Sequence, residues 1–252
     1  MGLDALGILR NSFSGLKSDV GKKIVGIFFA VQLLHFGGTV LTRQELTLAG
    51  VSVTVFAAVL SIVATIGALR AFREGELKRE MFTENILATI GRILGANLTN
   101  AVFAYGVAML LLAPAVYLAA LSGITAASGL SGASAAVLVA LGVGGILGVG
   151  AAAYIAVAFL LAQPLIAIDD RRMFQALDES IQRTKGERLS IFLALAILFL
   201  GYTVIAVLVA IAGSFVNEMV AGAATTLVVA PLLTSLSLCL LNYLTEELPE
   251  AE

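Results

Sequence analysis

The chain has 252 residues, of which 60% are apolar and only 13% are Asp, Glu, Lys or Arg, and its mean hydropathy is +1.02. A soluble domain carries roughly 25% charged and about 45–50% apolar residues, and it needs polar side chains to cover its surface. The composition therefore predicts an integral membrane protein. It excludes a soluble enzyme, a secreted disulfide domain, a nucleic-acid binder and a disordered tail as descriptions of the whole chain.

Six apolar stretches are long enough to cross a bilayer, whose roughly 30 Å of hydrocarbon takes about 20 residues of helix. They cover residues 24–41, 46–69, 101–121, part of 133–168, 189–213 and 220–241. The fourth stretch is too long for one straight span and too short for two. Its glycine-rich first half and Pro164 favour one long, tilted or bent helix. The expected fold class is all-α, a polytopic membrane protein with six transmembrane helices.

The basic residues predict the orientation of these spans. Of the 15 Lys and Arg residues, only Arg43 falls in a loop on one side of the spans, and the others fall on the opposite side. Loops rich in Lys and Arg face the cytoplasm. Both termini and the two long loops are therefore expected in the cytoplasm, with the protein in the cell (plasma) membrane. The first span has no apolar h-region before Lys22 and is expected to act as a retained signal anchor.

Three segments on the expected cytoplasmic side carry apolar residues at helical spacing, one before each odd-numbered span. Their apolar faces consist of Leu6, Leu9, Phe13 and Leu16 in the first, Phe82, Ile86, Ile90 and Ile93 in the second, and Met173, Leu177 and Ile181 in the third. Such amphipathic helices either lie in the headgroup plane or pack beneath the bundle as a cytoplasmic shelf. The sequence leaves both arrangements open.

An amphipathic helix followed by two spans is thus expected three times, in residues 1–70, 74–168 and 170–243. Together these units are expected to form one transmembrane domain, residues 1–243, followed by an acidic cytoplasmic tail, residues 244–252. Because each unit has two spans, all three share one orientation. They therefore lack the inverted repeats that many alternating-access transporters use.

The third unit contains Gln163-Pro164-Leu165-Ile166, then Asp169-Asp170, then Ala176-Leu177-x-x-Ser180-x-x-x-Thr184-Lys185-Gly186 before the next span. With Asn242-Tyr243 closing the last span, this stretch resembles the membrane domain of glycerophosphoryl diester phosphodiesterases and related stand-alone, uncharacterised polytopic proteins of bacteria and archaea. The residues that carry the likeness are Pro164, Ser180, Thr184, Lys185 and Gly186. In that family the hydrolase chemistry belongs to a separate soluble barrel domain. The resemblance therefore implies a membrane module and not a hydrolase, and the acidic C-terminal residues suit an archaeal stand-alone member.

The same stretch also has a purely physical interpretation. Gly186 is placed as a helix stop. Four basic residues around it are candidates for contact with lipid phosphate or for anchoring at the headgroups, namely Arg171, Arg172, Lys185 and Arg188. Asp169 and Asp170 either bind a divalent cation or form a salt-bridged turn with the adjacent arginines.

Polar residues inside the spans are costly in hydrocarbon and are therefore the first functional candidates. His35 lies in the first span, one turn after Gln32. This pair either lines a polar cavity or forms a hydrogen bond between helices. The cores of the six spans contain no Asp, Glu, Lys or Arg, which argues against a proton-driven pump. A lone histidine makes no conventional metal site and no cofactor motif is present, so no catalytic residue, metal or cofactor is expected.

These observations favour a non-enzymatic membrane protein that interacts with membrane lipids, or with a protein partner or a second copy of itself, and not with nucleic acid. A transporter or channel for a small or amphiphilic solute, with Gln32 and His35 in its cavity, is the alternative. An intramembrane lipid enzyme ranks last, because no acid–base or nucleophile–base pair stands out in the sequence.

Overall fold

The computed structural model of the chain describes residues 4–121, 135–215 and 222–249, and helices are the only regular elements in these three ranges. Six helical stretches of the described chain are long and apolar enough to cross a membrane, judged by length and composition. This confirms the all-α fold with six apolar helices and is consistent with a multi-pass membrane protein. The start of the predicted sixth span, at residue 220, lies outside the described residues.

Two of the six stretches are interrupted helices. The uninterrupted ones are α2 (Asp19–Arg43), α3 (Thr47–Glu74), α4 (Ile86–Leu121) and α8 (Arg188–Ser214). The interrupted ones comprise α5 (Ala135–Ala158) with α6 (Ala162–Asp169), and the π-helical η2 (Thr225–Val229) with α10 (Ala230–Glu247). The shorter elements are α1 (Ala5–Lys17), η1 (Arg79–Phe82) and α7 (Met173–Arg183).

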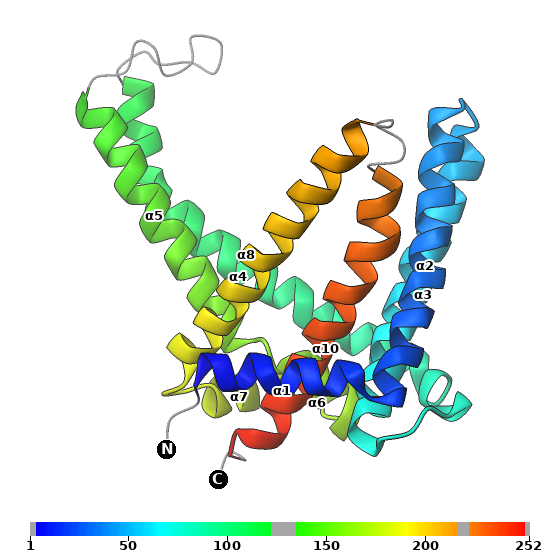
Figure 1. The fold of residues 1–252 in the computed structure, drawn as a ribbon. Coiled ribbons are helices and arrows are strands. Elements are labelled where there is room, and N and C mark those ends of the chain that lie inside the picture. The colour runs from blue at the N-terminus through cyan, green and yellow to red at the C-terminus, as the bar shows by residue number, and fades with distance from the viewer. Residues whose placement is uncertain (1–3, 122–134, 216–221, 250–252) are drawn as a thin grey trace.

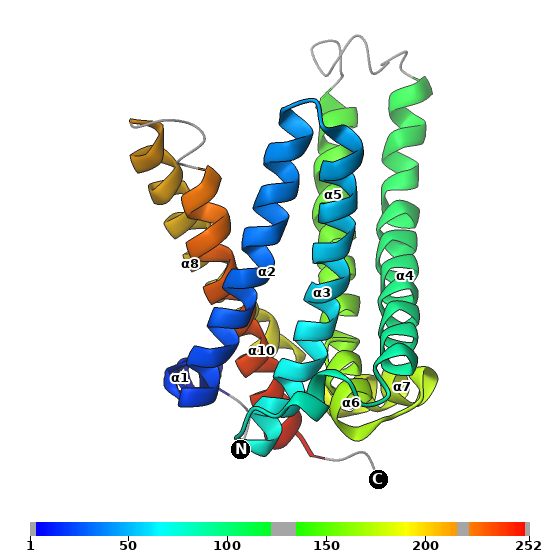
Figure 2. The same cartoon turned by 90° about the vertical axis from the view of Figure 1, so that its right-hand side faces the viewer.

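One end of the bundle carries α1, η1, α6 and α7 together with both ends of the described chain, and we call it the basal end (Figures 1 and 2, bottom). The core lies there, because the fully buried side chains gather in its helices: Ile8, Ile24, Ile66, Leu69, Leu161, Leu165, Ile166, Ile191, Leu240 and Leu244. Above it, the pair α4–α5 leans away from α2–α3, with α8 and α10 between them (Figure 1). In a membrane, the exposed apolar side chains of these upper halves would face lipid tails.

The central element of the basal core is α10. It contacts α1, α2, α3 and α6, and 39% of its apolar stretch is buried, against 11% for α4 and for α8. Residues 244–247, expected in the acidic tail, continue α10 as helix, and Leu244 is fully buried. The helix therefore reaches below the span that hydropathy alone delimits.

Helix α1 packs beneath the bundle, which is one of the two arrangements that its amphipathic sequence allows. It lies crosswise beneath the spans (Figure 1), and Ile8, Leu9 and Ser12 are buried in its contacts with α10 and α8. Leu6 and Phe13, which belong to the predicted apolar face, are instead 66% and 48% exposed. One side of α1 thus packs on the protein, and a second apolar side remains open.

The prediction of a separate second amphipathic helix is wrong. Phe82 ends η1, and Asn85, with φ of +51°, precedes a continuous α4 of 36 residues, about 54 Å long at 1.5 Å per residue. Ile86, Ile90 and Ile93 therefore form the basal extension of a span. The polar residues after Ile93 do not interrupt the helix, since Thr99 donates its hydroxyl to the carbonyl of Gly95 one turn back.

Helix α7 packs as a shelf against α6 and α4. Its buried residues are Ala176, Leu177, Ser180 and Arg183, so the buried face is rotated from the predicted one toward polar side chains. Ile181, from the predicted face, is 36% exposed.

The fourth stretch is bent, as predicted. Helix α5 ends at Ala158 and α6 begins at Ala162, with Pro164 in its first turn. Proline has no N–H and its ring crowds the carbonyl four residues earlier, which explains the break upstream. Pro231 acts similarly in the sixth stretch, where the N–H of Ala230 bonds the carbonyl of Thr225 across a π turn.

A close contact between α3 and η1 provides a test of this packing. A Cβ atom added to Gly67 would lie 2.2 Å from the ring of Phe82. We expect Gly67→Ala to displace η1 and cost about 1–3 kcal/mol of stability, as overpacking does, measured by thermal unfolding in detergent. Gly91→Ala on α4, where an added Cβ meets nothing within 4 Å, is the control and should unfold no earlier than the parent. Equal midpoints for the two variants would contradict the packing.

Candidate functional site

The break between α5 and α6 is held by one side chain of α7. The hydroxyl of Ser180 donates to the carbonyl of Ala158 at 2.7 Å and accepts the N–H of Leu161 at 3.0 Å. Ser180 is fully buried. Both backbone groups lose their helical partners at the break, and leaving such groups unpaired in a low-dielectric interior is costly. The serine of the family-like motif is therefore a bridge between helices.

The remaining motif residues fix the turn from α7 into α8. Thr184 is fully buried and donates to the carbonyl of Ser180 at 2.8 Å. Gly186 takes a φ of +95°, a conformation that favours glycine. Arg188 then donates to the hydroxyl of Tyr154 and to the carbonyl of Ile181, and its guanidinium lies 4.6 Å from the centre of the Tyr154 ring.

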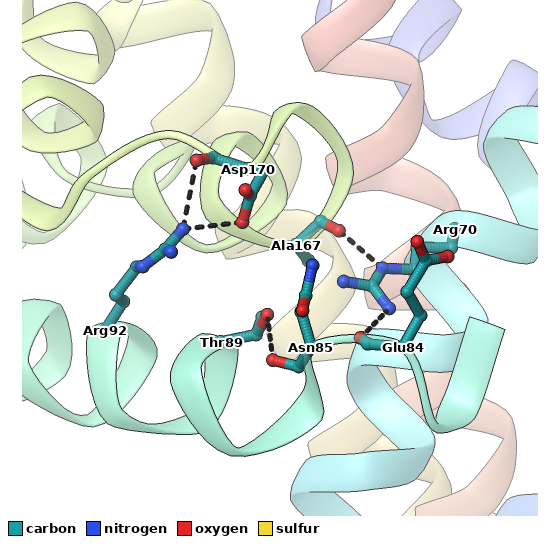
Figure 3. Close-up of polar contacts among 7 residues, drawn as sticks. All are labelled: Arg70, Glu84, Asn85, Thr89, Arg92, Ala167 and Asp170. Carbon is teal, nitrogen blue, oxygen red and sulfur yellow. Dashed lines mark hydrogen bonds and ion pairs between the residues drawn. The ribbon is translucent and has the colours of Figure 1, made fainter. Parts of the chain in front are cut away.

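Two further arginines attach α6 to its neighbours (Figure 3). Arg70 of α3 donates to the carbonyl of Ala167 at 2.7 Å and to that of Glu84 at 2.9 Å. Arg92 of α4 donates to Asp170, to its carboxylate at 2.6 Å and its carbonyl at 3.0 Å. Asp170 ends α6 in the left-handed conformation. It thus forms the salt-bridged turn that the sequence suggested, but with Arg92 rather than with its neighbours.

A third group of arginines surrounds Glu179 and the end of α10. Glu179 pairs with Arg171 and with Arg183, whose side chain is only 4% exposed and also donates to the carbonyl of Thr245. These arginines line a polar pocket of about 300 Å³ together with Arg73, Asp169 and Glu246, and Arg73 pairs with Glu246. The three arginines of this pocket are matched in charge by Asp169 and Glu246 in its lining and by the nearby Glu179.

The four predicted phosphate contacts therefore divide into two kinds. Arg171 and Arg188 bond to protein groups through their side chains, whereas the side chains of Arg172 and Lys185 are exposed and have no hydrogen bond or ion pair within the described chain. Elsewhere, hydrogen bonding to Glu76 raises the pKa of Lys78 above its usual value. Near the N-terminus, Arg10 and Lys17 of α1 are exposed, and no protein partner for them occurs among the described residues.

An apolar groove lies between α1, α8 and the η2–α10 stretch, with a volume of about 460 Å³. Its lining consists of Leu9, Phe13 and Leu16 from α1, Ile197, Leu198, Gly201, Tyr202, Ile205 and Val209 from α8, and Val228, Val229, Leu232, Leu233 and Leu236. The phenol of Tyr202 is the only polar side-chain group in this set. The volume falls in the roughly 300–1,000 Å³ range of small-molecule sites.

Gln32 and His35 do not come together in one cavity. Both are half-buried, and hydrogen bonds of their side chains are absent from the described part of the chain. His35 lines a pocket of about 300 Å³ at the end of the bundle opposite the basal end, with Thr39, Arg43 and Thr226. Gln32 is not among the residues that line it.

Comparison with family models, with curated proteins and with solved structures found no match. Within the described ranges, no three His, Cys, Asp or Glu side chains come close enough together to hold a metal ion. The candidate site is the apolar groove, because its lining is apolar except for one phenol and suits an apolar ligand. The sequence does not reveal this groove, although Leu9, Phe13 and Leu16 all belong to the predicted apolar face of α1.

The bridge by Ser180 gives a test of how the basal end is held together. Ser180→Ala leaves the carbonyl of Ala158 and the N–H of Leu161 unpaired, which costs about 1–3 kcal/mol for each buried group. We expect a correspondingly lower unfolding midpoint in detergent. Ser190→Ala on α8 removes a half-buried hydroxyl without a hydrogen bond in the described chain and is the matched control. If both variants unfold like the parent, Ser180 does not hold the break.

Proposed function

We propose that this chain is a non-enzymatic, multi-pass protein of the cell membrane that binds a lipid of the cytoplasmic leaflet at its basal end. Both termini lie in the cytoplasm in this proposal. The observation that carries it is the apolar groove between α1, α8 and α10, which is open to the surroundings of the bundle and has an amphipathic helix at its base.

The dimensions of the groove match one lipid tail. Its lining on α8 extends from Ile197 to Val209, which is about 18 Å of helix at 1.5 Å per residue. One leaflet contributes half of the roughly 30 Å hydrocarbon thickness. A single chain that enters beside α1 would therefore lie along α8 through most of its own leaflet.

The charge distribution supports the orientation. The basic residues near the basal end include Arg10, Lys17, Lys23, Arg172 and Lys185, all exposed, while Arg43 stands near the opposite end. Basic residues are retained on the cytoplasmic side of membrane proteins. They would there meet the anionic surface of the inner leaflet.

The two other functions have less support. A transporter needs a polar path across the bilayer, and the pocket at His35 lies at one end of the bundle and lacks Gln32. An intramembrane enzyme needs paired reactive groups, and the three arginines of the polar basal pocket are engaged in ion pairs with Glu246 or Glu179. The likeness of residues 163–186 to phosphodiesterase membrane domains fits a membrane module, and a protein partner or a second copy remains compatible with it.

The orientation can be measured with introduced cysteines, because the natural Cys239 is buried and should stay silent. Gln44→Cys lies in the turn after α2 and Lys185→Cys in the turn after α7, and both positions are exposed. A membrane-impermeant maleimide applied to intact cells should label Gln44→Cys alone, and permeabilised cells should label both. Labelling of Lys185→Cys on intact cells would reverse the topology.

Occupancy of the groove can be tested by filling it. Gly201 lines the groove, and a Cβ added there meets nothing within 4 Å, so Gly201→Phe should fold and occupy the space with its ring. Native mass spectrometry after graded delipidation should find a lipid retained by the parent that Gly201→Phe releases at least about tenfold more readily, which corresponds to about 1.4 kcal/mol.

The matched control is Gly106→Phe on α4, an exposed glycine that also has open space around it and does not line the groove. This variant should retain lipid like the parent. Equal retention by all three proteins would show that the groove holds no lipid and would overturn the proposal.

A further inference from the structure

We propose that the lipid in this groove is an anionic phospholipid, with its phosphate headgroup bound between Arg10 and Lys17 of α1. This inference rests on the proposed function. It names the headgroup class that the groove selects, and it moves the phosphate contacts from Arg171, Arg172, Lys185 and Arg188, the residues on either side of α7 that the sequence suggested, to α1.

The spacing of residues on α1 supports this assignment. Arg10, Phe13 and Lys17 stand at positions i, i+3 and i+7 and therefore share one side of the helix. Phe13 lines the groove, and Arg10 and Lys17 stand on either side of Phe13 along the helix. Both are exposed, and their long side chains can keep the charged ends at headgroup level while their stems lie along apolar surface.

Among the residues that the structure describes, none compensates the charges on this side of α1. The side chains of Arg10 and Lys17 have no ion pair or hydrogen bond within the described chain. Asp4 caps the first turn of α1 by accepting the N–H groups of Leu6 and Gly7, and Asp19 pairs with Lys22. Two positive charges therefore remain available for a phosphate.

The headgroup rather than the tail must provide selectivity. A tail that moves from the bilayer into the groove exchanges one apolar environment for another, so it gains packing contacts but little hydrophobic free energy. Each basic residue near an anionic membrane surface strengthens association roughly fivefold. Two residues would thus give a preference on the order of 25-fold over a zwitterionic lipid, reduced by salt.

The absence of tryptophan from the sequence permits a direct measurement. The full chain with Phe13→Trp is reconstituted into phosphatidylcholine vesicles that contain an increasing fraction of lipid brominated in the acyl chain, which quenches nearby tryptophan. The brominated lipid is either phosphatidylglycerol or phosphatidylcholine with the same chains. Half-maximal quenching should need at least about tenfold less brominated phosphatidylglycerol, and high salt should reduce this difference.

Matched variants separate the headgroup site from general lipid contact. Arg10→Gln with Lys17→Gln should abolish the difference between the two brominated lipids, whereas Arg172→Gln with Lys185→Gln, also exposed and unpaired in the described chain, should keep it. Phe199→Trp reports from an exposed position on α8 outside the groove lining and should show no preference. If Phe13→Trp does not fold, Tyr202→Trp reports from inside the groove.

The outcomes distinguish this inference from the proposed function. Equal quenching of the groove tryptophan by the two lipids, with lipid still released by Gly201→Phe, would leave a lipid-binding groove without headgroup preference and would overturn only the present proposal. A preference that survives Arg10→Gln with Lys17→Gln would overturn it as well. If neither brominated lipid quenches the groove tryptophan, both proposals fail.

Discussion

A helix that breaks inside a membrane protein exposes backbone groups that find no water to bond, and the rest of this structure depends on how one such break is satisfied. Pro164 imposes the break between α5 and α6, and the fully buried hydroxyl of Ser180 bonds a backbone group on each side of it. Because one hydroxyl serves both groups, α7 must lie directly against the break. The position of α7 then determines where its charged residues can reach.

Arginines extend this arrangement across the basal end by donating to backbone carbonyls. Arg70 reaches Ala167 of α6, and Arg183 reaches Thr245 of α10. Bonds of this kind join α3, α6, α7 and α10 at their ends. Arg70, Arg92, Arg183 and Arg188, four of the basic residues that predict the orientation, are thereby committed to structure. Positive charge at a membrane surface is therefore weak evidence of lipid binding until each residue's partners are known.

The sequence predicts the features that depend on solvent and on local chain chemistry, and it misses those that depend on distant contacts. Hydropathy suffices for six apolar helices, and Pro164 suffices for a bend. Neither signal reveals that Arg70 donates to a carbonyl 97 residues away, or that α4 runs unbroken past the polar residues near Asn97. The groove forms only where α1, α8 and the η2–α10 stretch pack together, so no single segment predicts it. The residues of α1 that line it are nevertheless recognisable as apolar. Ser180 could have been noticed, since a serine on a helix whose neighbour is broken by proline has an evident partner.

The difference between α1 and α7 explains why we place the proposed lipid site on only one of two helices with similar amphipathic sequences. The buried face of α7 includes Ser180 and Arg183, which bond to other helices. Both polar and apolar side chains of α7 are therefore engaged in packing against the protein. Helix α1 packs on α10 through a narrow side, where Gly15 lies against Cys239. Leu6 and Phe13 then remain exposed beside Arg10 and Lys17, whose side chains pair with no group in the part of the chain that the structure describes. A helix held by one narrow face keeps a second face exposed, and in the proposed function that second face is where the lipid is recognised.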